Sequence, residues 1–93
     1  MESDFEKRQK AIKRILCDDI KNGKLFNIPK NHEILINRCG NLAIRITDGD
    51  SNDGIIRELN AWALAKDCVI ETRSSLGEDW SWIEGHIDIE III

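Results

Sequence analysis

The sequence predicts an α+β fold, a two-layer sandwich in which two helices cover one face of a four-stranded, mainly antiparallel sheet. Apolar residues recur at helical spacing in two segments, and β-branched residues gather in four short runs. The order helix–strand–strand–helix–strand–strand joins these runs as two hairpins, which pack most simply with the helices as two layers. A chain of 93 residues is the size of one small domain, and we expect residues 1–93 to form it.

The first helix is predicted over residues 4–22. Ser3 and Glu6 have the spacing of a capping box, and Asn22-Gly23 is a usual helix end. The apolar positions expected to face the sheet are Phe5, Ile12, Ile15, Leu16 and Ile20. Basic residues recur along another side at Lys7, Lys10, Arg14 and Lys21. They form either a solvated face or a docking stripe for an acidic partner, and the sequence leaves both interpretations open.

A connector and the first hairpin come next. We expect the apolar residues Leu25, Phe26 and Ile28 to lie under the sheet, before Pro29 ends the segment. Strands are predicted over 33–37 and 42–47. The turn between them, 38–41, contains Gly40 and Asn41, which tolerate positive φ. In the second strand, residues alternate between an apolar face and a second face that carries Ala43 and Arg45.

The second helix is predicted over residues 55–66, after the polar loop 48–54. Ser51 or Asp53 is the expected N-cap. The apolar stripe of this helix comprises Ile55, Ile56, Leu59, Trp62 and Ala63. A third strand is predicted over 68–73, and a loop over 74–78 leads to the fourth.

The end of the chain, residues 79–93, has the clearest strand pattern. From His86 to Glu90 polar and apolar residues alternate, so one face is apolar and the other acidic. We expect the isoleucine face to join the core and the acidic face to be open to solvent. Trp80 and Trp82 share the parity of the acidic face. The alternative is that both tryptophans fill the core beside Trp62, because a bulge at a glycine can change which face a strand residue takes.

Charge and composition suggest an intracellular protein with an acidic body. The net charge of −4 divides into +3 for residues 1–30 and −7 for residues 31–93. No apolar run reaches the length of a membrane span, and the start of the chain lacks a signal-peptide pattern. Three cysteines without a CxxC spacing indicate a reducing compartment, so a cytoplasmic location without membrane contact is expected. Cys17 and Cys68 are expected in or near the core, and Cys39 at the surface.

Motifs for metal binding or catalysis are weak. Asp48, Asp50 and Asn52 match the first ligand positions of an EF-hand loop, but the glycine and the final glutamate of that motif are missing. A Ser-His-Asp set around His86, or a Cys-His pair of Cys39 and His32, lacks the accompanying sequence signals. We therefore predict no catalytic residues, no metal site and no cofactor.

The same strand suggests protein recognition. Single-strand nucleic-acid binding combines aromatic and basic groups, but here the tryptophans adjoin acids that repel phosphate, so direct nucleic-acid binding is not expected. Exposed tryptophans are frequent binding hot spots. The predicted partner-binding residues are Trp80, Trp82, Glu78, Asp79, Glu84, His86, Asp88 and Glu90.

These residues suit a protein partner with a basic surface. The favoured function is a small inhibitor or immunity-type protein, encoded by a phage or mobile element against a defence enzyme, which acts by occluding that partner. The alternative is a regulatory domain that binds a nucleotide or another small ligand near 48–53. Such a domain could form a homodimer.

Overall fold

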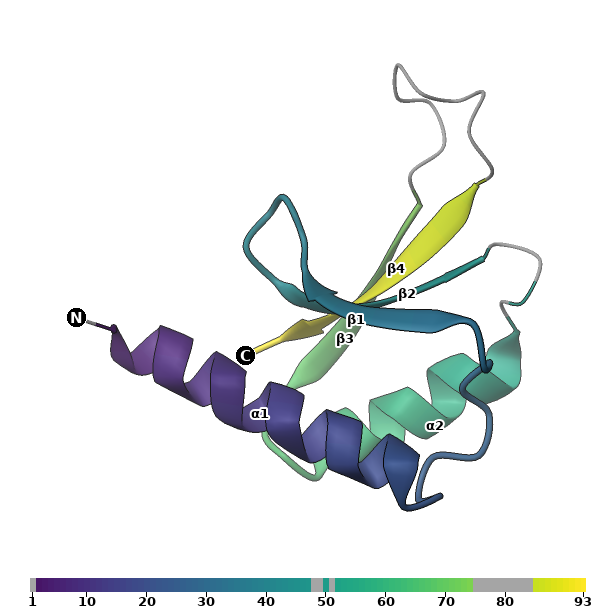
Figure 1. Cartoon of the computed structure of the whole chain (residues 1–93), viewed down its shortest axis with the longest axis horizontal. Helices are drawn as coiled ribbons and strands as arrows, with labels where there is room; N and C mark the ends of the chain where they lie inside the picture. The colour runs from purple at the N-terminus through teal and green to yellow at the C-terminus, as the bar shows by residue number, and fades with distance from the viewer. Residues whose placement is uncertain (1, 48–49, 51, 75–84) are drawn as a thin grey trace.

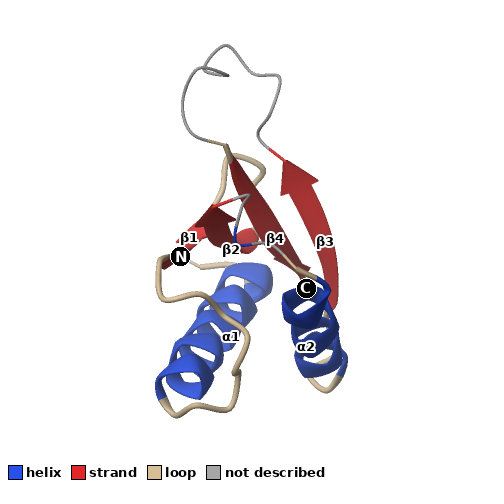
Figure 2. Ribbon diagram, turned by 90° about the vertical axis from the view of Figure 1, so that its right-hand side faces the viewer, coloured by secondary structure: helices blue, strands red, loops and turns tan. Residues whose placement is uncertain are grey.

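The computed structural model describes residues 2–47, 50, 52–74 and 85–93, and it shows the predicted α+β sandwich. Its elements are α1 (Asp4–Lys21), β1 (His32–Ile36), β2 (Leu42–Thr47), α2 (Asp53–Leu64), β3 (Val69–Ser74) and β4 (His86–Ile92). The strands form one antiparallel sheet in the order β1-β2-β4-β3. Both helices lie on the same side of the sheet (Figures 1 and 2). In this order β1 and β3, the first strand after each helix, are the edges of the sheet.

The alternation in β2 and β4 determines the core. Ile44 pairs with Ile89 across the two central strands, and their side chains face the helices together with Leu42, Ile46 and Ile91. Leu16 of α1 completes this core with the predicted stripe of α2: Ile55, Leu59, Trp62 and Ala63 are buried, and Ile56 packs against them. The helix layer is thus built mainly from residues that have helical spacing in the sequence. In α1, however, Phe5 and Ile15 were expected to face the sheet and are exposed, whereas the polar Gln9 is buried.

The two helices begin at side-chain caps. Ser3 accepts the backbone N–H of Glu6 at the start of α1, as the capping box predicts. At α2 the N-cap is Asn52, whose Oδ1 accepts the N–H of Ile55 at 3.0 Å. The prediction of Ser51 or Asp53 was therefore wrong by one position, and α2 begins and ends two residues earlier than expected. None of the described helices is long and apolar enough to cross a membrane.

Several residues expected in the core are exposed. Phe26 is 84% exposed, because the Glu58 carboxylate accepts the N–H groups of Phe26 and Asn27 and holds the connector along α2. Leu25 is buried as expected. Cys17 is exposed because it lies about 100° around α1 from the buried Leu16.

The tip of the β1–β2 hairpin holds the end of β4. Gly40 has a φ of 81°, the left-handed conformation that glycine accepts without strain. The Gly40 carbonyl accepts a 2.9 Å hydrogen bond from Gln9, a buried glutamine of α1. On the other side of the sheet, Asn37 and Asn41 of the same turn donate to Glu90 of β4. The hairpin tip is therefore fixed to both layers.

Candidate functional site

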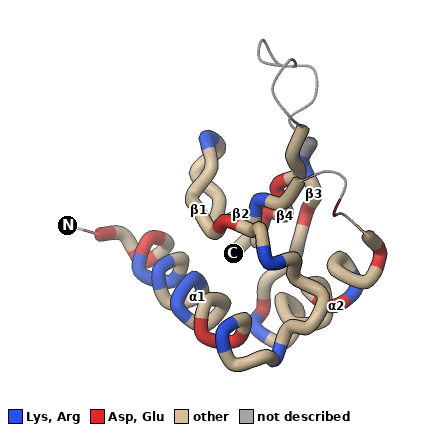
Figure 3. The backbone as a smooth tube through the Cα atoms, turned by 45° about the vertical axis from the view of Figure 1, so that its right-hand side comes forward, with Lys and Arg blue, Asp and Glu red and all other residues tan. Residues whose placement is uncertain are grey.

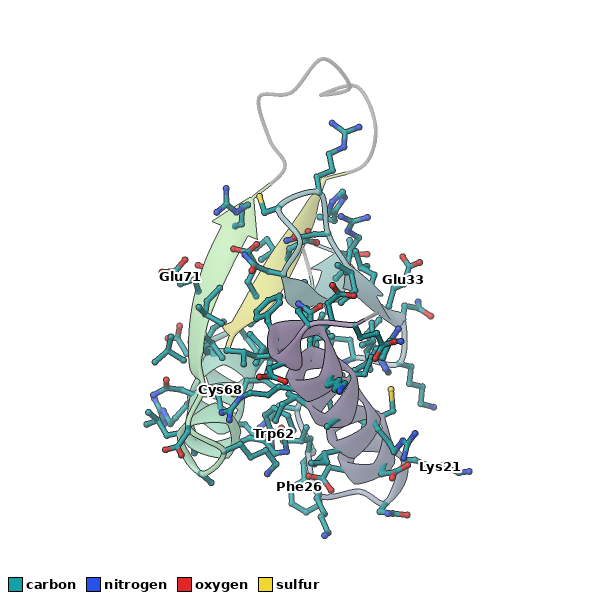
Figure 4. The ribbon with its side chains drawn as sticks, turned by 90° about the vertical axis from the view of Figure 1, so that its left-hand side faces the viewer. Lys21, Phe26, Glu33, Trp62, Cys68 and Glu71 are labelled. Carbon is teal, nitrogen blue, oxygen red and sulfur yellow. The ribbon has the colours of Figure 1, made fainter. Side chains whose placement is uncertain are left out.

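The face of the sheet opposite the helices, here called the uncovered face, carries a row of alternating charges. The strand registers place Glu33 of β1, Arg45 of β2, Asp88 of β4 and Arg73 of β3 side by side in that order. Glu71 lies two residues before Arg73 on β3, on the same face and opposite Glu90. Figure 4 shows Glu33 and Glu71 at opposite edges of the sheet. We call Glu33, Arg45, Asp88 and Arg73 the charge row.

At the centre of the row, Arg45 and Asp88 form a two-pronged ion pair. Arg45 Nε donates to Asp88 Oδ1 at 2.7 Å, and its Nη2 donates to Oδ2 at 3.0 Å. The hydrogen bonds to Asp88 raise the pKa of Arg45 most, and the charge of Glu33 adds to the rise. Two parallel hydrogen bonds hold the guanidinium in one orientation and also balance its charge. Asp88 is only 6% exposed, so it holds Arg45 from below the surface.

Glu90 is a buried carboxylate satisfied from three sides. It is 0% exposed and accepts from Asn37 Nδ2 at 2.5 Å, Asn41 Nδ2 at 3.1 Å and Arg73 Nε at 3.1 Å. Burial alone would raise the pKa of Glu90, but these hydrogen bonds outweigh it and hold the pKa below its ordinary value. Glu90 is thus a charged structural group that orients Arg73 and the hairpin tip.

The expectation that Asp88 and Glu90 present their carboxylates to solvent was therefore wrong. Alternation placed them on the correct face, but each is covered by an arginine of a neighbouring strand. His86 is also half-buried, with its Nε2 3.9 Å from Asp88 Oδ1. The remaining predicted site residues, Trp80, Trp82, Glu78, Asp79 and Glu84, lie outside the described residues, so their role stays a prediction.

Sequence reasoning did not identify Arg45 and Arg73 as site residues. Opposite charges on one face of neighbouring strands are a signal for cross-strand pairs. However, this signal can be used only when the strand register and the order β2-β4-β3 are known, and the alternation of polar and apolar residues predicts neither. The two asparagines that bond Glu90 flank a turn, where such residues usually serve the turn itself.

The residues considered for metal binding and catalysis are either used in local structure or exposed. In the part of the chain that the structure describes, no group of three or more His, Cys, Asp or Glu side chains could hold a metal ion. Asn52, a ligand in the EF-hand interpretation, caps α2 instead, and Asp48 is outside the described residues. Cys39 is exposed at the hairpin turn, as expected. His32 bonds the Pro29 carbonyl through Nδ1 at 2.7 Å.

A shallow groove lies in the helix layer, between α1 and the β1 edge. It encloses about 260 Å³ and is lined by Glu6, Gln9, Lys10, Lys13 and Ile36. Pockets for small molecules usually hold about 300–1,000 Å³ and are more enclosed. This groove is lined by α1 and β1 and not by residues 48–53, where a small ligand was expected, so that alternative stays a prediction.

Comparisons with protein-family models, curated proteins and solved structures give no significant match. The functional argument therefore depends on the geometry of the chain alone.

Proposed function

We propose that this protein binds a partner protein through the uncovered face of its sheet and the adjoining segment 78–84. Binding covers a working surface of the partner, as an inhibitor or immunity-type protein of a phage or mobile element would do. The observation that carries the proposal is the one-sided arrangement of the helices. None of the described helices or strands covers the other face of the sheet, and that face carries charges held in fixed positions.

The charge row suits recognition because its arginines are ordered before any partner arrives. Arg73 is 55% exposed along its side chain while Glu90 holds its Nε. Ordering a long side chain at an interface costs about 0.5–1.5 kcal/mol, and a side chain that is already held avoids part of this cost. Arginine is also among the residues enriched at binding hot spots. In this proposal Asp88 and Glu90 are positioning residues, the arginines contact carbonyl groups of the partner, and the exposed Glu33 and Glu71 meet its basic side chains.

The net charge of this surface still favours a basic partner. Among the described residues, four carboxylates and two guanidinium groups lie on the uncovered face, at Glu33, Glu71, Asp88, Glu90, Arg45 and Arg73. Asp88 and Glu90 are buried, so Glu33 and Glu71 are the acids that a basic partner would meet. The sequence adds Glu78, Asp79 and Glu84 in the segment that joins β3 to β4. Complementary charge speeds encounter, and Trp80 and Trp82 would supply the apolar contact.

A photo-cross-linking residue at position 71 tests the proposal, with the same residue at Arg57 as the matched control. Both positions are exposed, but Arg57 lies on α2 in the helix layer. In cells that carry the gene, we expect position 71 to give a discrete adduct that position 57 does not give. Trp80→Ala combined with Trp82→Ala should abolish the adduct, and added protein should inhibit the captured partner stoichiometrically. Equal adducts from both positions, or an uninhibited partner, would contradict the proposal.

A further inference from the structure

The β1 edge is a second surface that suits a partner, separate from the uncovered face. β1 pairs only with β2 among the described strands, so its other side has no neighbouring strand. The opposite edge, β3, carries the exposed charges Glu71 and Arg73, which are typical protection against further pairing. β1 carries one exposed charge, Glu33, and then the apolar run Ile34-Leu35-Ile36, in which Ile36 is 46% exposed.

The hydrogen-bond pattern identifies the free backbone groups of this edge. The N–H of Asn37 donates to the Asn41 carbonyl at 2.9 Å, so this opposed pair is a hydrogen-bonded one. Such pairs alternate along antiparallel strands. The next ones are therefore Leu35 with Ala43 and Glu33 with Arg45, in the observed register. It follows that the N–H and C=O groups of Ile34 and Ile36 point away from β2, toward the open edge.

The groove beside this edge determines which side chains an added strand could carry. Ile34 and Ile36 face the helices, so residues of an added strand opposite them would face the groove lined by Lys10 and Lys13. Lysine stems cover apolar surface while their amines seek negative charge. Residues of the other parity would lie beside Leu35 on the uncovered face.

The charge around the groove favours an acidic segment. Two basic residues, Lys10 and Lys13, and one acid, Glu6, line the groove. Basic residues predominate along this part of α1 (Figure 3). Lys13 has no ion pair within the described residues, and Lys10 pairs with Glu2. Both partners of that pair are solvent-accessible, and exposed ion pairs contribute little to stability, so Lys10 can exchange its partner at little cost.

We propose that β1 accepts an extended segment of a partner protein as a fifth strand. In this segment acidic side chains face Lys10 and Lys13 of α1 and alternate with apolar side chains beside Leu35. Main-chain bonds to Ile34 and Ile36 provide affinity, and the lysines select the acidic sequence.

The first test uses a fluorescein-labelled peptide of four valine–glutamate repeats, with four valine–lysine repeats as the control peptide. We expect the acidic peptide to bind the full chain and the basic peptide not to bind. Lys10→Glu combined with Lys13→Glu should weaken binding at least about tenfold, which is about 1.4 kcal/mol. Lys21→Glu, the same charge change at the far end of α1, should leave binding unchanged. Equal binding of both peptides, or no binding, would overturn the proposal.

Amide hydrogen exchange measured by NMR provides the second test. Saturating acidic peptide should slow exchange at Ile34 and Ile36 and leave Glu33 and Leu35 unchanged, because the latter already donate to β2. Ile36→Pro, which removes an outward N–H, should weaken binding while circular dichroism shows the fold intact. Protection of the same amides without peptide, together with a dimer in sedimentation velocity, would assign the edge to a second copy of the chain and overturn the proposal.

Discussion

Replacing Glu90 with glutamine is expected to destabilise the protein although it changes one atom. Both asparagine donors reach Oε2, so the oxygen of the glutamine amide can keep those two bonds, while its NH₂ group then faces the Arg73 Nε–H. The charge-assisted bond is therefore lost. Hydrogen bonds to charged groups contribute about 1.5–3 kcal/mol. Because Arg73 can turn to solvent, we expect a loss of about 1–2 kcal/mol.

Urea denaturation at pH 7, followed by circular dichroism, measures this loss through the midpoint. Thermal unfolding should agree, since about 1 kcal/mol shifts the melting temperature of a domain this small by about 4–8 °C. Glu71→Gln is the matched control, because Glu71 is exposed on the same face and no hydrogen bond to its carboxylate occurs among the described residues. It should change stability by less than about 0.5 kcal/mol. Equal midpoints for Glu90→Gln and the wild type would refute the role assigned to Glu90.

Three further outcomes follow from the same contacts. Because folding lowers the pKa of Glu90, the ionised carboxylate contributes to folding stability above its unfolded-state pKa near 4.5, and this contribution is lost as pH falls through the folded-state pKa. Urea midpoints from pH 7 to 3 should therefore fall less in Glu90→Gln than in the wild type. Arg45→Met should cost about 2–4 kcal/mol by leaving the buried Asp88 without its partner, and Asp88→Leu in the same background should recover part of that loss in the same assay. Trp62→Phe should cost about 1–2 kcal/mol in thermal unfolding, because the indole N–H donates to Asp19 of α1 at 2.8 Å and links the two helices; a change below about 0.5 kcal/mol would contradict this.

The sequence predicts the layers of this fold well because its strongest signals are periodic. Alternation in β2 and β4 identifies the face that joins the core, and Ile44, Ile89 and Ile91 are buried as predicted. Gly40 marks the hairpin turn through its positive φ. These features depend on residues close in the chain, so composition and spacing are sufficient to find them.

The site is harder to predict because it depends on pairs distant in the chain. Alternation assigns Glu90 to the uncovered face, but its burial results from Arg73 and two asparagines brought to it by the strand order. Similarly, Phe26 is apolar and yet exposed, because Glu58 of α2 binds its backbone. A local pattern gives the direction of a side chain, whereas its burial depends on its tertiary neighbours.

Tryptophan accessibility tests the central claim most directly, since the proposed surface requires Trp80 and Trp82 to be open in the free protein. Acrylamide quenching of the wild type, Trp80→Phe and Trp82→Phe separates them from Trp62, which is buried between the helices. We predict readily quenched fluorescence in the wild type and the loss of an accessible component in each variant. If all three tryptophans are protected in a monomeric protein, the two outer ones belong to a core, and the uncovered face lacks its proposed anchors.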